Sequence, residues 1–296
     1  MRKLNFELKN ICKRNRDGSF STQGNRERML SMIADQLHAV GFKTDKMSAQ
    51  DLKGRHVNRL VELWKADGVT AGTMKNRMAA LRWWAEKVGN PGAVQADNSV
   101  YGIEDRVYVT NTDKAARLED VDFSKLKEER IRLSVELQRV FGWRREEAMK
   151  FQPSYALDGV ALEKASLIKI KDTWAKGGRP REIPILNEEQ RRILQRVVEV
   201  AGIGSMIPPD RSYKQHLRYF EVMTAAAGIG RTHGLRHLYA QTRYLELTGF
   251  ACPAAGGLSL KEKTPEQRVI DREARLVITR ELGHGRIHVT SIYLGT

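Results

Sequence analysis

The 296-residue sequence lacks the features that mark membrane-spanning, secreted and disulfide-bonded proteins. It has no apolar run approaching the roughly 18 residues of a membrane-spanning helix. Its basic N-terminus, residues 1–16, has no apolar segment of the kind found in secretory signals. The two cysteines, Cys12 and Cys252, lie far apart and belong to no disulfide or metal motif. We therefore expect reduced thiols and a cytoplasmic protein.

The sequence also has little that predicts a metal site. Two histidine pairs, His233 with His237 and His284 with His288, are spaced four residues apart. This spacing places both imidazoles on one helix face, but neither pair has the glutamate of the His-Glu-x-x-His zinc motif. We therefore expect no metal and no other cofactor.

Positive charge is what the sequence has in excess. It contains 51 Lys and Arg against 36 Asp and Glu, a net charge of +15. Such a field attracts polyanions, of which nucleic acid is the commonest in cells. The excess is divided almost equally between residues 1–112 and the remainder, which favours two lobes that both contact the polyanion. Charge alone also fits a ribosome-associated or merely basic soluble protein.

The N-terminal third predicts a small helical domain, and the overall length suits two domains. Residues 1–24 are polar and basic and predict a loosely packed arm. Apolar residues then recur at three- and four-residue steps, which predicts helices near 25–41, 56–66 and 71–88. The aperiodic stretch 101–112 predicts a linker.

The remainder of the chain mixes helices with one short hairpin. A helix is predicted over 124–141, and two strand-like runs, 166–170 and 181–185, flank a Gly-rich tip around Lys176. Residues 248–271, which contain several Gly and Pro, predict a loop. Further helices are predicted at 188–201, 213–227, 233–247 and 272–282.

Six polar residues of this region occur in an order along the chain that is informative about function. Taken singly, each is an ordinary surface residue. They are Arg144, Lys176, His233, Arg236, His284 and Tyr293.

The motifs around these residues resemble those of the tyrosine recombinase (phage integrase) family. Phe141-Gly142-Trp143-Arg144-Arg145-Glu146-Glu147 resembles the family's Thr-Gly-Leu-Arg-x-x-Glu box, and Lys176 before Gly177-Gly178 resembles its hairpin lysine. His233-Gly234-Leu235-Arg236 resembles the His-x-x-Arg box. Leu282-Gly283-His284, followed by Tyr293, resembles the final box with its usual spacing.

The resemblance implies a fold class, a domain plan and partners. The fold is expected to be mainly α with a small β-hairpin (α+β). A helical core-binding domain with its basic arm would occupy residues 1–100, a linker 101–112 and a catalytic domain 113–296. The implied partners are double-stranded DNA and further copies of the chain, as a tetramer on paired DNA sites. Accessory DNA-bending or directionality proteins are left open, and the implied location is the cytoplasm, at the nucleoid when DNA is bound.

The resemblance departs from the family in two places. Gly234 stands where the family often has Asp, and the stretch from Arg236 to His284 is longer than usual. The extra length falls in the loop predicted over 248–271. Its Phe250 and two leucines are candidates for a contact with a neighbouring protomer, and a mobile surface loop is the alternative.

The activity implied is site-specific DNA recombination through a 3′-phosphotyrosyl intermediate at Tyr293, without metal or ATP. Tyrosine is a weak nucleophile because its pKa is about 10. His233 would take or share its proton, and Lys176 would protonate the leaving 5′ oxygen as a general acid.

The arginines would bind the phosphate. Arg144 and Arg236 would clamp the non-bridging oxygens with charge-assisted bonds, because guanidinium groups stay charged throughout the reaction. His284 would donate a further bond to the phosphate. Glu147, three residues after Arg144, would orient Arg144 or His233.

Two other functions use the same residues or the same fold. A type IB topoisomerase would relax supercoiled DNA with the same catalytic groups, and a DNA-binding protein could use the fold without catalysis. Helices upstream of the catalytic region favour an integrase over the first, and the intact set of six residues disfavours the second.

Five basic residues are candidates for contacts with DNA. Phosphate or groove contacts require cations on an accessible face. On the helix over 71–88 the candidates are Lys75, Arg77 and Arg82, and on the hairpin they are Arg179 and Arg181. The alternative for these residues is a solvated face without a ligand.

Overall fold

The computed structural model describes residues 1–116 and 122–296 and divides into two compact units. The first unit is Met1–Val107 and the second is Tyr108–Thr296, so the division falls within the segment 101–112 that was predicted as the linker. The described residues are mostly helical and contain one two-stranded sheet. This confirms the predicted fold class.

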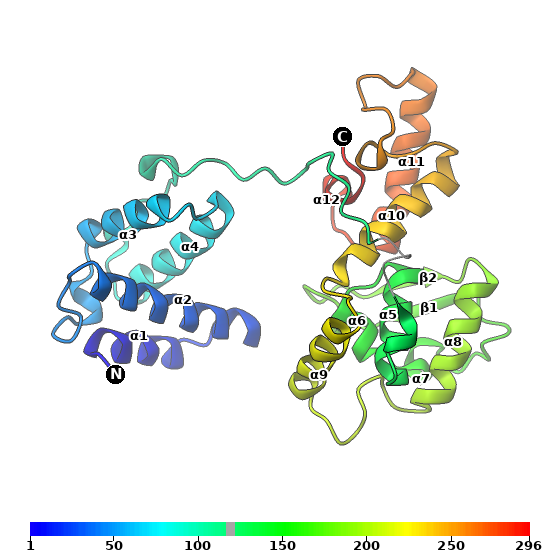
Figure 1. Ribbon diagram of the computed structural model, residues 1–296, viewed down its shortest axis with the longest axis horizontal. Coiled ribbons are helices and arrows are strands. Elements are labelled where there is room, and N and C mark those ends of the chain that lie inside the picture. Colours follow the sequence, from blue (N-terminus) through cyan, green and yellow to red (C-terminus); the bar gives the residue numbers. More distant parts are fainter. Residues whose placement is uncertain (117–121) are drawn as a thin grey trace. The chain divides into compact units, whose positions relative to one another are not determined.

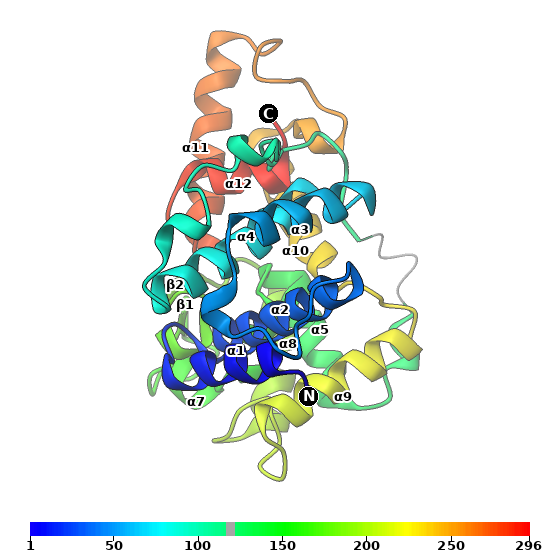
Figure 2. The same cartoon turned by 90° about the vertical axis from the view of Figure 1, so that its left-hand side faces the viewer.

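Four helices and several short 3₁₀ turns form the first unit (Figure 2, blue to cyan). The helices are α1 (Lys3–Arg14), α2 (Phe20–Ala39), α3 (Gly54–Ala66) and α4 (Ala71–Lys87), and the turns are η1 (Ala49–Asp51), η2 (Pro91–Ala93) and η3 (Ser99–Tyr101). Each helix contributes one apolar stripe to a common core. Trp64 and Trp84 lie at its centre and are fully buried.

Helix α1 occupies the segment that was predicted as a loosely packed basic arm, so that prediction is wrong. Leu4, Leu8 and Cys12 recur every four residues and are buried in the core of the unit. Lys3, Lys9, Lys13 and Arg14 are exposed on the outer face of the helix. The polar composition of residues 1–24 therefore hid a helical period that three apolar residues are enough to define.

The second unit contains the hairpin and eight helices among its described residues. They are α5 (Glu129–Phe141), α6 (Arg145–Lys150), α7 (Pro153–Ala156), β1 (Leu167–Ile170), β2 (Arg181–Pro184), α8 (Glu188–Ala201), α9 (Tyr213–Ala226), α10 (His233–Thr248), α11 (Pro265–Glu281) and α12 (Ile287–Leu294), with 3₁₀ turns η5 (Phe123–Lys125), η6 (Asp172–Trp174) and η7 (Pro253–Ala255). In Figure 1 and Figure 2, α11 and α12 lie at one end of this unit and α7 lies at the other.

The strands pair antiparallel, with Leu167 opposite Pro184 and Ile170 opposite Arg181. Ile168, Ile170 and Ile183 face the core and are buried, as the two-residue period of a half-buried strand requires. The connection between the strands carries Lys176 away from that core.

Helix α11 begins earlier than the sequence predicted. Residues 248–271 were expected to be a loop, but the helix starts at Pro265. Thr264 caps it by accepting from the Gln267 backbone NH, and the Gln267 side chain accepts from the Thr264 NH in return. Proline is well suited to the first helical position because its missing NH would be unpaired there anyway. The true loop is thus 249–264.

Part of that loop packs into its own unit. The Phe250 ring lies 5.8 Å from the Tyr244 ring, whereas Leu258 and Leu260 are each 48% exposed. Phe250 is therefore partly buried in its own unit, and a contact of the loop with a neighbouring protomer stays a prediction. None of the described helices is both long and apolar enough to cross a membrane.

Candidate active site

The second unit brings together most of the six residues singled out in the sequence. Arg144 precedes α6, His233 and Arg236 lie in the first turn of α10, and Tyr293 lies in α12. His284 lies in the turn between α11 and α12. Arg236, His233 and His284 all contact the hydroxyl or the ring of Tyr293.

Arg236 is the centre of the site and is completely buried. Its Nη1 donates to the carbonyl of Gly142 at 2.5 Å, and its Nη2 donates to the carbonyl of Leu282 at 2.6 Å. Its Nε donates to the Tyr293 hydroxyl at 3.2 Å. Burial, together with the nearby charge of Arg144, lowers its pKa to about 10, so the guanidinium remains charged at neutral pH. The buried guanidinium of Arg236 therefore links the three segments that contain Gly142, Leu282 and Tyr293.

The turn before Arg144 requires a glycine. Gly142 has a φ of 62°, in the left-handed region, and a Cβ there would lie 2.4 Å from the Tyr239 ring. Glycine is the residue that adopts this conformation without penalty. The tight turn places the Gly142 carbonyl on Arg236 and starts α6 at the residue after Arg144.

Tyr293 is only 6% exposed and is surrounded by imidazoles. The His284 ring stacks on it with centroids 5.2 Å apart, and the His237 ring lies 4.6 Å away. His233 Nε2 is 3.5 Å from the Tyr293 hydroxyl. His233 keeps an exposed face, so the site opens to solvent on that side. The hydroxyl thus faces one cation and one base.

His233 and His284 both have lowered pKa values and resist protonation. Desolvation, followed by the charges of Arg236, Arg144 and Lys176, lowers the pKa of His233. Burial and neighbouring arginines lower the pKa of His284 to about 3. A neutral His233 can accept a proton, which is what the chemistry predicted from the sequence requires.

His284 is placed differently from its predicted role. Its Nε2 lies 3.0 Å from Arg236 Nη2, which can only donate, so Nε2 accepts. The ring proton is then on Nδ1, which lies 2.9 Å from Thr290 Oγ1. Donation from His284 to a phosphate would require the Arg236 contact to break.

Glu147 is a fully buried carboxylate that joins two arginines. It accepts from Arg144 Nη1 at 2.9 Å and from both Nη atoms of Arg181 at 3.0 and 2.9 Å. Burial alone would raise its pKa, but the Arg181 bonds and the charges of Arg236 and Arg144 hold it at about 2. Glu147 therefore orients Arg144 by direct contact, and it makes no hydrogen bond with His233.

Lys176 lies on the connection between β1 and β2 and is exposed. It makes no hydrogen bond or ion pair with a described residue. Its charge nevertheless contributes to lowering the pKa of His233, so it lies within electrostatic range of that residue. The structure does not bring Lys176 into contact with the other five residues.

Comparison with known families identifies the chain. A family model described as "Phage integrase, N-terminal" matches residues 1–91, and one described as "Integrase" matches residues 107–242. The chain belongs to the tyrosine recombinase (phage integrase) family. This confirms the resemblance in the sequence, and as a member of the family the chain is a site-specific DNA recombinase. No curated protein matches the sequence.

Solved structures share the fold of this recombinase. A lambda integrase tetramer bound to a Holliday junction is 16% identical, with a TM-score of 0.59, over 98% of this chain and 76% of that chain. XerH site-specific recombinase bound to its difH substrate is 16% identical, with a TM-score of 0.57, over 98% and 81%. The Tn1549 transposon integrase in complex with circular intermediate DNA is 13% identical, with a TM-score of 0.55, over 100% and 96%. At these identities the likeness concerns the fold.

The candidate DNA-contacting residues of the first unit have partners within that unit. Lys75 Nζ binds Asp105 at 2.6 Å, and Arg82 donates to the Gln95 carbonyl at 2.9 Å. The Arg77 guanidinium lies over the Trp64 ring, 5.1 Å from its centroid. These contacts hold the three side chains close to the surface of the helical unit, and their role in DNA binding stays a prediction.

The two hairpin arginines lie on the turn that carries His284. A side chain at Gly285 would collide with the Arg179 guanidinium, so exposed Arg179 rests directly on this turn. The side chain of Arg181 is 8% exposed and is held by Glu147 and by the Glu281 carbonyl. Arg181 therefore braces the integrase site from within, a position unlike that of a residue facing DNA.

The sequence reasoning missed two residues that shape the surroundings of Tyr293. The His237 ring lies tilted against the Tyr293 ring with centroids 4.6 Å apart, and Thr290 Oγ1 lies 2.9 Å from His284 Nδ1. The four-residue spacing of His233 and His237 was visible, but it was weighed as a metal motif. Among the described residues, no three His, Cys, Asp or Glu side chains gather in a way that could hold a metal ion.

Proposed function

We propose that this recombinase cleaves DNA by attack of the Tyr293 hydroxyl on a backbone phosphodiester. The observation that carries the proposal is the environment of that hydroxyl, which lies 3.2 Å from a buried guanidinium and 3.5 Å from a neutral imidazole. A cation lowers the energy of the developing phenolate, and a base removes the proton.

The proton of Tyr293 passes to His233. The hydroxyl lies 3.5 Å from His233 Nε2, to which it can donate when Nε2 is unprotonated, while Arg236 Nε donates to the same oxygen. As the phenolate oxygen bonds to phosphorus, His233 becomes positively charged and Arg236 continues to stabilise the phenolic oxygen. Burial keeps solvent from Arg236, so its electrostatic effect is stronger than it would be in water.

Arg144 and Arg236 bind the non-bridging oxygens. Arg236 already uses all but one of its five N–H groups on Gly142, Leu282, His284 and Tyr293. Among the described residues, the Arg144 side chain contacts Glu147 alone, and it remains 23% exposed. Arg144 therefore has more N–H groups free to bind the phosphate oxygens. Arg236 mainly holds the surrounding segments of the site in place.

Lys176 protonates the leaving group. When the bond between phosphorus and the 5′ oxygen breaks, that oxygen takes a proton from the Lys176 ammonium and leaves as a 5′ hydroxyl. The DNA end is left as a 3′-phosphotyrosyl ester on Tyr293. The position of Lys176 on an exposed connection is consistent with closure onto bound DNA.

Rejoining reverses these steps with a second 5′ hydroxyl. The ester keeps the energy of the original phosphodiester, so the proposed reaction needs neither ATP nor metal. Exchange between two duplexes requires four such sites, and we propose a tetramer on paired DNA sites. The lambda integrase tetramer bound to a Holliday junction has the same fold and is consistent with this assembly.

A nicked suicide substrate tests the proposal. The bound DNA sequence is first located by footprinting, and a nicked duplex of that sequence is then incubated with the full chain and with Tyr293→Phe. The full chain should form a covalent adduct, and the Phe variant should bind the same DNA without forming one. An adduct with Tyr293→Phe would refute the assignment. Relaxation of any supercoiled plasmid, without paired sites, would indicate a topoisomerase instead.

A further inference from the structure

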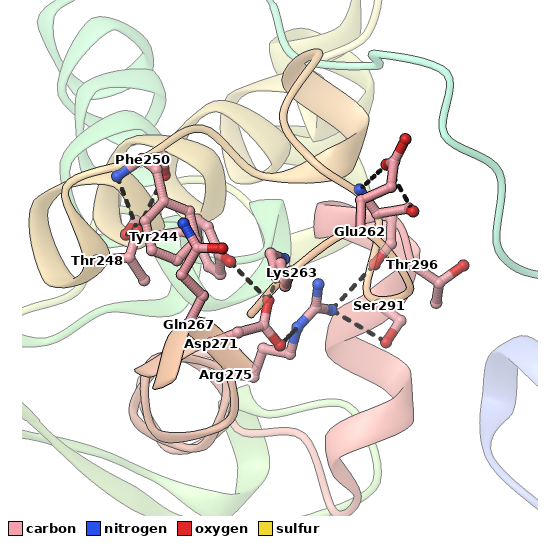
Figure 3. Close-up of polar contacts among 12 residues, drawn as sticks. Tyr244, Thr248, Phe250, Glu262, Lys263, Gln267, Asp271, Arg275, Ser291 and Thr296 are labelled. Atoms are coloured by element: carbon pink, nitrogen blue, oxygen red, sulfur yellow. Dashed lines mark hydrogen bonds and ion pairs between the residues drawn. The ribbon is translucent and has the colours of Figure 1, made fainter. Parts of the chain in front are cut away.

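A cluster of buried charges lies beside the site but outside the proposed reaction (Figure 3). Lys263, Asp271 and Arg275 are 3%, 3% and 7% exposed. Lys263 Nζ lies 2.7 Å from Asp271 Oδ1, and Arg275 Nε lies 2.8 Å from Asp271 Oδ2. The Tyr244 hydroxyl also donates to Asp271, at 2.6 Å. Buried ion pairs add little stability over apolar packing, because removing charges from water is costly.

The free end of Arg275 reaches helix α12. Its Nη1 donates to Ser291 Oγ at 3.2 Å and to the Gly295 carbonyl at 3.0 Å. These acceptors lie two residues before and two residues after Tyr293. A carbonyl at the C-terminal end of a helix has no donor within the helix, and a cation is favourable there. Arg275 therefore supplies the partner that the last turn of α12 lacks.

The loop over 249–264 packs against the same last turn of α12. A Cβ on Gly295 would lie 2.8 Å from the Ala254 backbone nitrogen and 3.1 Å from Pro253. Cys252 and Ala254 also belong to the apolar cluster that contains Tyr293. The segment that adds length between the two catalytic boxes thus packs against the end of the nucleophile helix.

The charges of Lys263, Asp271 and Arg275 are arranged so that Arg275 is held toward α12. Burial alone would raise the pKa of Asp271, but hydrogen bonds from Lys263, Tyr244 and Arg275 lower it below its ordinary value. The ionised carboxylate fixes Arg275 Nε and so directs Nη1 at α12. Lys263 comes from the loop, so the loop and the arginine are joined through one carboxylate.

We propose that Arg275 is a positioning residue for Tyr293, held in place by Asp271 and by Lys263 of the loop. This inference rests on the proposed function, in which Tyr293 is the nucleophile. Outside the bonds of the helix itself, the Tyr293 carbonyl has a long contact with the Gln241 amide, at 3.5 Å, and Asn111 holds Thr296 beyond it. Without the bonds from Arg275 to Ser291 and Gly295, the last turn of α12 loosens. The Tyr293 hydroxyl then moves away from Arg236 and His233.

Two conservative variants and one control test the inference. Arg275→Lys keeps a charge for Asp271 but loses the planar guanidinium whose Nη1 reaches both acceptors on α12 while Nε binds Asp271. Ser291→Ala removes one of those acceptors and little else. Arg272→Lys is the control, since Arg272 lies exposed on the same helix.

The measurement is the single-turnover rate of covalent capture at saturating nicked DNA, beside the DNA Kd and the melting temperature. We expect Arg275→Lys to capture DNA about 10- to 100-fold more slowly, because misplacement of a reacting group by about 1 Å has an effect of this size. Its Kd should stay within about twofold of that of the unchanged chain. Ser291→Ala should slow capture less, and the double variant should lose less than the product of the two effects because both remove one contact.

The outcomes separate this inference from the proposed function. An adduct with Tyr293→Phe would overturn the function itself. If Tyr293→Phe forms none while Arg275→Lys and Ser291→Ala capture DNA at the rate of Arg272→Lys, only the positioning role fails. A loss of rate that follows a loss of DNA affinity would also overturn it. Should Arg275→Lys fail to fold, the rate and Kd of Ser291→Ala decide the question.

Discussion

Replacement of Glu147 by glutamine probes the buried charge network beneath the site. The carboxylate is fully buried, and its pKa falls from 4.5 to about 2 because Arg181, Arg236 and Arg144 outweigh the cost of burial. At 1.36 kcal/mol per pKa unit, that lowering corresponds to ~3 kcal/mol of preference for the ionised form. Loss of one partner from a buried pair typically costs about 3–5 kcal/mol, which agrees. Glu147→Gln should therefore destabilise the second unit by ~3 kcal/mol.

The assay is thermal unfolding of the full chain, with Glu146→Gln as the matched control. Each kcal/mol shifts the melting temperature of a domain of this size by about 2–4 °C, so a decrease of roughly 10 °C is expected. Glu146 makes the same kind of pair with Lys150, but at the surface, where such a pair contributes at most ~1 kcal/mol. DNA capture should also fall, because Arg144 loses its anchor. If the two variants melt within about 2 °C of each other, the reasoning on the buried carboxylate is wrong.

Three further predictions concern proton transfer, pH and domain linkage. Lys176→Ala should slow cleavage about 10²–10⁴-fold, and a 5′-bridging sulfur, which leaves without a proton, should restore the rate; equal losses on both substrates would make Lys176 a phosphate-binding residue. The free energy of unfolding should decrease as the pH falls below 6.5, because His237 and His284 have lowered pKa values in the folded state, about 4 and about 3, and the unfolded chain binds their protons first. Denaturant titrations between pH 8 and pH 4 measure this, and a flat profile would contradict it. Residues 1–107 and 108–296, expressed separately, should each bind DNA more weakly than the full chain, because linkage raises effective concentration. If either part alone bound DNA as tightly as the full chain in a binding titration, the two units would not bind DNA together. Binding by the full chain should also weaken steeply with salt.

Local sequence patterns predicted much of the fold. Thr70 precedes the helix predicted over 71–88, and its hydroxyl caps that helix by accepting from the Thr73 NH. The alternation of apolar residues in 166–170 predicted a strand whose isoleucines are buried. Periods and caps of this kind depend on neighbours within a few residues. Helix α1 was not predicted because only three apolar residues define its buried face.

The site could be predicted in part. The order and spacing of motifs, which a sequence displays directly, singled out Arg236 and Tyr293, and the structure brings them together. The surrounding contacts join residues far apart in the chain, such as Arg181 with Glu147 and Arg275 with Gly295. No local pattern records such a contact, so Arg181 was predicted to face DNA when it braces Glu147.

The most direct test of the central claim is to locate the covalent link between protein and DNA. After capture on a nicked substrate, trypsin digestion should release a peptide that begins at Ile287, after Arg286, and in which Tyr293 is the one tyrosine. Mass spectrometry should find the nucleotide on Tyr293, attached through a 3′ phosphate. Attachment at any other residue, or cleavage that leaves a free 3′ phosphate or 3′ hydroxyl with no protein attached, would contradict the proposed reaction.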